Sequence, residues 1–340
     1  MEGRLDRLGK LGIRYPVMQA GMPGAANVRL AAAVSRAGGI GTLGLQDVST
    51  WEDSLAQLMV QADGHPVNAN LLLPYTRKAH VLAVLRQQIP IVTLFWGTAR
   101  AHVKALQAEG RFVFQQIGSV DEANAALETG VDGLIVQGVE AGGHVRGIAP
   151  LSTLLPQVRA LSDSVPCFAA GGMYNASDVR RVAALGADGV SSGSRFLVTA
   201  ESHAHPAYKQ RILDASETLY TRLFGLGWSA PHRVIPNKAT RRWCAEDGSV
   251  PAWLNALNDL FAFTRKVFPF KAEAALRQKP GVPLFTNAVL DASLPEHLVE
   301  SCPLYAGERV ADLQSMLTAE AAVHRLAEGF SMSEEAGARS

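Results

Sequence analysis

The chain has 340 residues, with 32 lysines and arginines against 31 aspartates and glutamates, so its formal net charge is +1. This balance, without a basic block interleaved with aromatic residues, argues against a nucleic-acid partner and favours small molecules. The three cysteines, Cys167, Cys244 and Cys302, lack C-x-x-C spacing, which argues against a zinc site or a disulfide framework and fits a reducing, cytoplasmic setting.

The N-terminal stretch MEGRLDRLGKLGIRYPV contains no apolar signal-peptide core. No later run approaches the ~18 consecutive apolar residues that a membrane helix needs. We therefore expect a soluble, cytoplasmic protein with no membrane partner and no metal site.

Eight short apolar or β-branched runs, separated by segments of helical period, follow between residues 15 and 194. They are YPVMQA, GIGTLG, VNANLL, IVTLFW, FVFQQI, GLIVQG, CFAAGG and GVSSGS. In the intervening helices we expect Asn27 and Ser119 to be N-caps, and Gly38 and Gly130 to be C-caps. This alternation predicts an α/β fold, and eight units favour a (β/α)8 TIM barrel. A doubly wound open sheet is the competing architecture, but the first turn, QAGMPGAAN, is not G-x-G-x-x-G.

After Phe196 the strand rhythm stops. The stretches HPAYKQRILDASETLYTRLF and PAWLNALNDLFAFTRKVF have helical patterns, and ERVADLQSMLTAEAAVHRLAEGF predicts one long amphipathic helix. We therefore divide the chain into a barrel at residues 1–219, a smaller helical insertion or cap domain without repeating strands at 220–303, a C-terminal helix that packs on the barrel at 304–330, and a flexible tail at 331–340.

Glycines gather at the carboxyl ends of the predicted strands, where parallel barrels hold their functional sites. Gly171 and Gly172 follow the seventh strand, and Gly193 and Ser194 follow the eighth. Both turns would expose backbone N–H groups, and a helix N-terminus adds partial positive charge. Either pair alone is an ordinary tight turn, but together they favour a site for a mononucleotide-type phosphate.

The loop EAGGHVRG after the sixth strand places His144 beside Gly142 and Gly143. It is either a tight turn that carries a surface histidine, or backbone that approaches a ligand closely beneath an imidazole acid or base. In the second case His144 would remove a carbon-bound proton or donate a hydrogen bond to an anionic oxygen. We expect Glu140 to order this loop through backbone N–H groups.

Amide side chains near the ends of the third, fifth and sixth strands are candidate ligand contacts. Gln115 and Gln137 could hydrogen-bond a heterocycle, because an unpartnered amide inside a barrel is costly. Asn70 either binds such a heterocycle or satisfies loop backbone. Ala20 and Gly21, after the first strand, lie where backbone could contact a flat ring.

The segments VQGVEAGGHVRG and FAAGGMYNASDVRRVAALGADGVSSGSRFLVTAES, with PVMQAGMPG, GGIGTLG and LYAGERV, resemble the nitronate monooxygenase family, formerly called 2-nitropropane dioxygenases. The resemblance covers about residues 13–200 and resumes near Tyr305. Its motifs are shared with FMN-containing enoyl-acyl-carrier-protein reductases and NAD(P)H:quinone reductases. It implies an FMN-dependent TIM-barrel enzyme, with FMN bound by the barrel at residues 1–219.

Position by position, the resemblance implies that His144 is the catalytic histidine. It also implies that the following residues bind the flavin: Ala20, Gly21, Met22, Asn70, Gln115, Gln137, Gly142, Gly143, Ala170, Gly171, Gly172, Gly193 and Ser194. There are two departures from the family pattern. Ser194 stands where threonine is usual, which keeps a hydroxyl donor. Val145 and Arg146 come between His144 and the next glycine, and the direction of Arg146 is open.

The activity implied is the oxidation of alkyl nitronates, and by extension nitroalkanes, by FMN and O2 to a carbonyl compound and nitrite. His144 would act as a base or as an anion-positioning group. One alternative is an NAD(P)H-dependent FMN reductase acting on an enoyl thioester or a quinone, and another is a flavin-binding protein without turnover. The expected partners are a small-molecule substrate and O2, with NAD(P)H for the reductase, and a homodimer is one assembly open to the chain.

Overall fold

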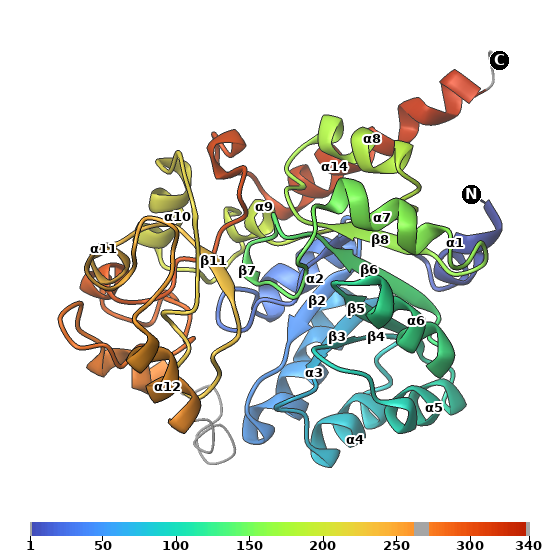
Figure 1. The fold of residues 1–340 in the computed structure, drawn as a ribbon. Coiled ribbons are helices and arrows are strands. Elements are labelled where there is room, and N and C mark those ends of the chain that lie inside the picture. The colour runs from blue at the N-terminus through green and yellow to red at the C-terminus, as the bar shows by residue number, and fades with distance from the viewer. Residues whose placement is uncertain (1, 262–271, 338–340) are drawn as a thin grey trace.

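The computed structural model describes residues 2–261 and 272–337, and its central feature is one sheet of eight parallel strands. The strands follow the order β1-β9-β8-β6-β5-β4-β3-β2. Their bounds are β1 Val17–Gln19, β2 Gly41–Gly44, β3 Val67–Leu72, β4 Ile91–Phe95, β5 Phe112–Ile117, β6 Gly133–Gln137, β8 Cys167–Ala170 and β9 Gly189–Ser192. A parallel bridge between Met18 and Ile40 joins β1 to the start of β2 and closes the sheet. The predicted barrel and all eight of its strands are confirmed (Figure 1).

Helices surround the barrel. Those that follow strands β1 to β8 are α2 Val28–Arg36, α3 Val48–Ala62, α4 Lys78–Arg86, α5 Arg100–Ala108, α6 Val120–Thr129, α7 Leu151–Arg159 and α8 Ala176–Ala184. The C-terminal α14, Ala319–Gly337, packs against α8 and α2, where the eighth helix of a barrel belongs. Gly329 permits this contact, because a Cβ there would lie 2.4 Å from the Cβ of Val179.

The helix caps follow the sequence closely. The side chains of Asn27 and Ser119 accept the N–H groups of Leu30 and Glu122 at the starts of α2 and α6. Gly130 ends α6 in the left-handed conformation, as predicted. At the end of α2 the cap is Ala37, and Gly38 follows it with a φ of +90°.

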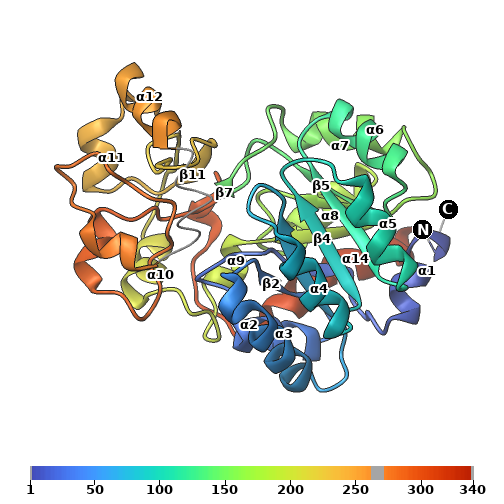
Figure 2. The same ribbon diagram turned by 90° about the horizontal axis from the view of Figure 1, so that it is seen from below.

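Alternate strand residues fill the inside of the barrel, and a helix not expected from the sequence closes its amino-terminal end. Phe112, Phe114 and Phe168 pack there with Leu8 of α1, Glu2–Lys10, and Leu8 is 1% exposed. Arg4 of α1 also pairs with the buried Asp188 at 2.8 Å. Figures 1 and 2 show α1 at one end of the barrel and the segment before α14 at the other.

That segment, between α9 (Ser194–Leu197) and α14, contains both helices and strands. Its helices are α10 Pro206–Leu213, α11 Lys238–Trp243 and α12 Ala252–Leu260, with the 3-10 helices η2 Ala272–Arg277, η3 Glu296–Glu300 and η4 Val310–Asp312. Two strands, β10 Leu219–Thr221 and β11 His232–Val234, pair antiparallel, and β11 also pairs with β7, Gly143–His144. The insertion therefore holds the expected helices and, in addition, two short strands that the sequence did not indicate. Strands of two or three residues carry no detectable alternation, and one of the three lies in a barrel loop.

Two helix predictions also need revision, and a third is described only in part. The stretch at 205–224 contains α10 and then β10, and the helix expected at 251–268 is described only as far as α12, because residues 262–268 lie outside the described part. The helix expected at 308–330 begins at Ala319, because the preceding Leu317 bridges to Thr199. Helix α14 then continues to Gly337, into the tail expected to be flexible. None of the described helices is both long and apolar enough to cross a membrane.

Candidate active site

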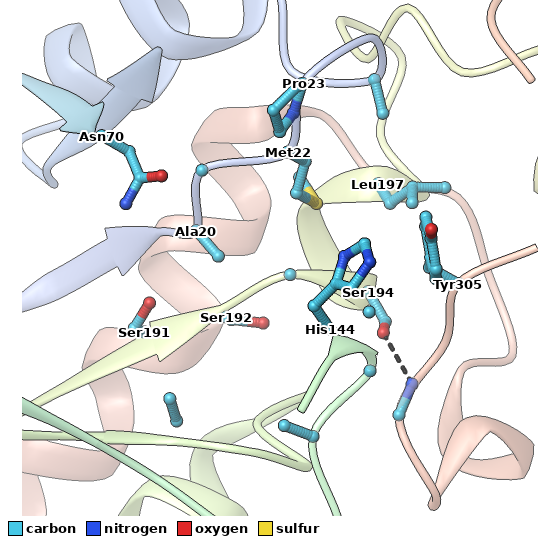
Figure 3. Close-up of a pocket in the computed structure, with 18 of the residues that line it drawn as sticks. Ala20, Met22, Pro23, Asn70, His144, Ser191, Ser192, Ser194, Leu197 and Tyr305 are labelled. Atoms are coloured by element: carbon cyan, nitrogen blue, oxygen red, sulfur yellow. Dashed lines mark hydrogen bonds between the residues drawn. The ribbon is translucent and has the colours of Figure 1, made fainter. Parts of the chain in front are cut away.

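A cavity of about 240 Å³ lies at the carboxyl ends of the barrel strands. Its walls come from the ends of β1, β3, β6, β8 and β9, from the loop with β7, and from the inserted segment. Figure 3 shows His144, Ser194 and Tyr305 on one side of the cavity and Ala20 and Asn70 on the other. Strand ends that are far apart in sequence therefore meet at one site.

All but one of the expected site residues line this cavity. They are Ala20, Gly21, Met22, Asn70, Gln137, Gly142, Gly143, His144, Ala170, Gly171, Gly172, Gly193 and Ser194. Gly21 and Asn70 are tightly packed, since a Cβ on Gly21 would lie 2.7 Å from the Cβ of Asn70. Among the described residues, no group of three or more His, Cys, Asp or Glu side chains is placed to hold a metal ion.

Gln115 is the exception, and its placement is a correction. Its side-chain amide donates to the carbonyls of Leu94 and Gly97 at 3.0 and 2.9 Å, on the outer side of the barrel. Gln116 lines the cavity instead. Side chains alternate along a strand, so Gln116 shares the inward face of Phe112 and Phe114, and the prediction at Gln115 was one residue out of register.

The glycine turns after β8 and β9 form one end of the cavity. Gly171 and Gly172 have φ values of +129° and +67°, a conformation that favours glycine. Helix α8 begins next to them, capped by Asn175. The Ser194 hydroxyl accepts the Gly307 N–H at 3.0 Å, and it still has a proton that it can donate (Figure 3). The N–H groups at the start of α8 are capped by Asn175 and Asp178, so the glycine turns and the Ser194 hydroxyl are the groups here that suit an anion such as phosphate.

The loop that carries His144 is held by Gln137 and Glu140. Gln137 donates to the His144 carbonyl at 3.1 Å and accepts the Arg146 N–H at 2.8 Å, so both ends of its amide bond to the loop. Glu140 accepts the Leu151 N–H at 3.0 Å, at the start of α7. The expected ordering role of Glu140 is therefore seen, and Gln137 orders the same loop from the cavity wall.

Aromatic rings surround the half-buried imidazole of His144. It stacks on Trp228 with ring centroids 4.3 Å apart, and the rings of Tyr305 and His232 lie at 5.4 and 5.6 Å. The Nε2 atom of His144 is buried and has no hydrogen-bond partner among the described residues. Desolvation, and then the neighbouring His232, hold the pKa of His144 well below its ordinary value. The imidazole is therefore neutral at pH 7 and has an uncommitted nitrogen.

His232 is a fixed, neutral neighbour rather than a second titrating group. Its Nδ1 lies 3.0 Å from the Ala230 carbonyl and its Nε2 accepts the Phe224 N–H at 3.3 Å, so both ring nitrogens are used. Burial lowers its pKa to about 4. Since β11 pairs His232 directly with His144, the insertion fixes the backbone that carries the candidate catalytic group.

The side chain of Arg146 points away from the cavity. Its guanidinium pairs with Glu122 and lies 5.2 Å from the ring centroid of Trp96, and it is not among the cavity residues. Trp96 has a φ of +68°, which is uncommon for a bulky residue, and packs edge-on against Trp228 at 4.9 Å. Arg146 therefore braces the aromatic cluster from outside.

Several cavity residues carry no recognisable signal in the sequence. Trp228, Asn287 and Tyr305 come from the inserted segment and the chain after it, and Tyr174 follows the β8 glycines. Of the cavity residues that were missed, Gln116 could have been predicted from the alternation of side chains along its strand. Nothing local in the sequence places Trp228 against His144, because the two residues meet through tertiary packing.

Comparison with known proteins gives concordant matches. The profile of the family described as "Nitronate monooxygenase" matches residues 6–96 and 63–262. A probable nitronate monooxygenase of Staphylococcus aureus (strain MSSA476) is 29% identical over 304 residues, which cover 75% of this chain and 84% of that protein. A carboxyl-CoA dehydrogenase of Mycobacterium tuberculosis (strain ATCC 25618 / H37Rv), whose named substrate is a hydroxy-methyl-oxo-octahydroindene, is 30% identical over 246 residues, 70% of this chain and 67% of that protein.

Two solved structures share the fold. Nitroalkane oxidase from Streptomyces ansochromogenes has a TM-score of 0.77 at 25% identity and covers 97% of this chain and 99% of its own. FabK from Thermotoga maritima has a TM-score of 0.77 at 24% identity and covers 98% of this chain and 99% of its own. The superposition extends over nearly the whole chain, so the inserted segment belongs to the shared architecture.

Proposed function

Because the chain belongs to the nitronate monooxygenase family of oxidoreductases, we propose that it oxidises small alkyl nitronates, and their parent nitroalkanes, with FMN and O2. The products would be a carbonyl compound and nitrite. One observation carries the proposal: a neutral imidazole with an uncommitted Nε2 lines the same cavity as two glycine turns suited to phosphate.

The cavity fits a flavin mononucleotide on the evidence of its own atoms. Gly171 and Gly172 leave backbone open where a side chain would intrude, and Ser194 has a proton to donate. Ala20 and Gly21 would contact the flat ring, and the phosphate would lie against the glycine turns. When bound, FMN would supply the redox chemistry, accepting electrons from substrate and passing them to O2.

His144 would handle the proton. For a nitroalkane, its neutral imidazole would take the α-proton and leave a nitronate in the cavity. For a nitronate supplied as the anion, the same ring would only orient it through a hydrogen bond. The stacked Trp228 would keep the imidazole in place during both steps, and the aromatic wall would exclude water.

Replacing His144 with asparagine tests this role. The variant should keep its bound flavin and lose turnover of neutral nitroalkane by ~10²-fold or more, because general base catalysis contributes that much. Turnover of the preformed nitronate should fall less. Equal activity of the variant and the wild type on the nitroalkane would remove His144 from the base role.

A second candidate is an NAD(P)H-dependent FMN reductase acting on an enoyl thioester or a quinone. It is favoured by the relative named as a carboxyl-CoA dehydrogenase, which indicates that thioester substrates occur among similar proteins. Anaerobic stopped-flow reduction of the flavin separates the two candidates. Fast bleaching by a nitronate, with slow bleaching by NADH and NADPH, supports the oxidation of nitronates, and the reverse pattern supports the reductase.

A further inference from the structure

Tyr174, in the turn between β8 and α8, carries a buried hydroxyl that no assigned role explains. The residue is 3% exposed and lines the cavity. Its hydroxyl has no hydrogen-bond partner in the described part of the chain. A Cβ on Gly307 would lie 2.5 Å from this oxygen, so the hydroxyl is packed against the backbone of Gly307. A buried donor without an acceptor is costly, and a ligand that supplies the acceptor would account for it.

The hydroxyl lies among the groups that form the anion-binding end of the cavity. Gly307 donates its N–H to the Ser194 hydroxyl at 3.0 Å, which brings the surroundings of Tyr174 next to the turn after β9. Tyr174 also lies only two residues after Gly172 in the chain. Tyrosine and serine hydroxyls thus meet at the turns where a phosphate would lie.

The charged side chains around this end are paired with one another, Arg309 with both Asp178 and Asp312. Asp178, the nearest carboxylate on α8, is occupied because it accepts the Tyr174 N–H at 3.0 Å and pairs with Arg309. The Cδ atom of Arg309 would lie 3.8 Å from a Cβ on Gly172, so its positive side chain runs beside the turn. Burial raises the pKa of Tyr174 above its ordinary value, the carboxylates of Asp178 and Asp312 add to the rise, and the Ser194 hydroxyl, which approaches the Tyr174 oxygen without the geometry of a full hydrogen bond, lowers it in part. Its hydroxyl therefore stays protonated and is a donor.

We propose that the hydroxyl of Tyr174 donates a hydrogen bond to the phosphate of the bound mononucleotide and makes the site select FMN over riboflavin. The inference rests on the proposed function for the presence of a flavin, and adds a side-chain contact to the backbone groups expected there. A hydrogen bond to a charged acceptor is stronger than one between neutral groups, so a single hydroxyl is sufficient for measurable selection.

The test is a fluorescence-quenching titration of flavin-free full-length protein with FMN and with riboflavin. Tyr174→Phe removes only the hydroxyl. It should weaken FMN binding by about tenfold and leave riboflavin binding unchanged. The flavin-free variant should melt no lower than the wild type, because the hydroxyl that is lost has no protein partner. Inorganic phosphate added to the titration should compete with FMN more strongly in the wild type than in the variant.

Tyr208→Phe is the matched control. Tyr208 is equally buried, but its hydroxyl donates to the Tyr305 carbonyl at 2.6 Å and it does not line the cavity. This variant should lose thermal stability and keep the wild-type ratio of FMN to riboflavin affinity.

The outcomes separate this inference from the function on which it rests. Wild-type protein that binds neither flavin would overturn both. Wild-type protein that binds FMN and riboflavin equally, or a Tyr174→Phe variant that loses both flavins in parallel, would overturn the phosphate contact and leave flavin binding intact. A Tyr174→Phe variant that is strongly destabilised or does not fold would show that the hydroxyl serves the protein itself, and this too would overturn the inference.

Discussion

Alanine at Gly193 is the most direct test of where the ligand lies. The residue follows β9 with φ −100° and ψ −70°, so a side chain adds no left-handed strain. A Cβ there would lie 3.6 Å from the Met22 sulfur and 3.8 Å from the Ala20 Cβ, which are ordinary contacts. All three residues line the cavity. The fold should therefore tolerate the methyl group, whereas a flavin packed against Gly193 should not.

The size of the effect follows from packing. An extra methyl group in a well-packed contact costs about 1–3 kcal/mol. If that cost falls on the bound ligand, the dissociation constant for FMN should rise by roughly 5- to 150-fold. Thermal unfolding of the flavin-free Gly193→Ala variant should match the wild type, and flavin fluorescence should report the weakened binding.

Two other glycines calibrate the result. A Cβ on Gly9, in α1, meets nothing within 4 Å, so Gly9→Ala should bind FMN normally and gain about 0.5–1 kcal/mol of stability from its helical position. A Cβ on Gly41 would lie 1.7 Å from the Ala31 carbonyl oxygen, so Gly41→Ala should fail to fold. If Gly193→Ala retains wild-type FMN affinity and stability, no ligand packs on this turn and the placement of the cofactor is refuted.

Three further predictions use other parts of the molecule. Gln116→Leu should weaken FMN binding, while Gln115→Leu should lower the melting temperature without changing FMN affinity. The opposite pattern would show that Gln115 is the residue that contacts the flavin. Urea unfolding from pH 7 to pH 4 should show stability falling with pH, by roughly 3 kcal/mol from His232 alone, because the unfolded histidine gains a proton near pH 6.5 and the folded one, with a pKa of about 4, does not. A flat profile would contradict the buried neutral state. Asp188→Asn should lower the free energy of unfolding by about 3–5 kcal/mol in the same assay, because Arg4 and Arg159 lose their buried partner. A loss under 1 kcal/mol would show that these two ion pairs are dispensable.

The barrel was predictable because its strands are buried on both faces. Such strands appear as short apolar runs between glycine-rich turns, and eight of them at regular intervals leave few topologies. The glycine turns at Gly171 and Gly193 were predictable for the same reason, because glycine marks the tight turns at the strand ends, and Gly171 has a positive φ there. Strand parity is also encoded, and it places Gln116 rather than Gln115 inside once Phe112 and Phe114 are recognised as interior.

The inserted segment was not predictable in the same way. Its strands β10 and β11 are short, and β11 exists through pairing with β7 in a loop about 90 positions earlier in the chain. The contact between Trp228 and His144 likewise depends on the relative placement of two distant segments. Periodicity reports local structure, so it indicated a cap domain but not which residues of the cap would line the cavity.

The low pKa of His144 in the free cavity is compatible with its use as a base. Proton transfer from a neutral nitroalkane creates an imidazolium and a nitronate together, and opposite charges in contact in a region of low dielectric constant each favour the charged form of the other. The desolvation that lowers the pKa before substrate arrives therefore strengthens the ion pair afterwards. A nitronate that arrives as an anion gains only a hydrogen bond from the neutral ring. If His144 is the base, the aromatic rings of Trp228 and Tyr305 would favour the substrate that must lose a proton. The ratio of nitroalkane to nitronate turnover would then measure the contribution of the insertion.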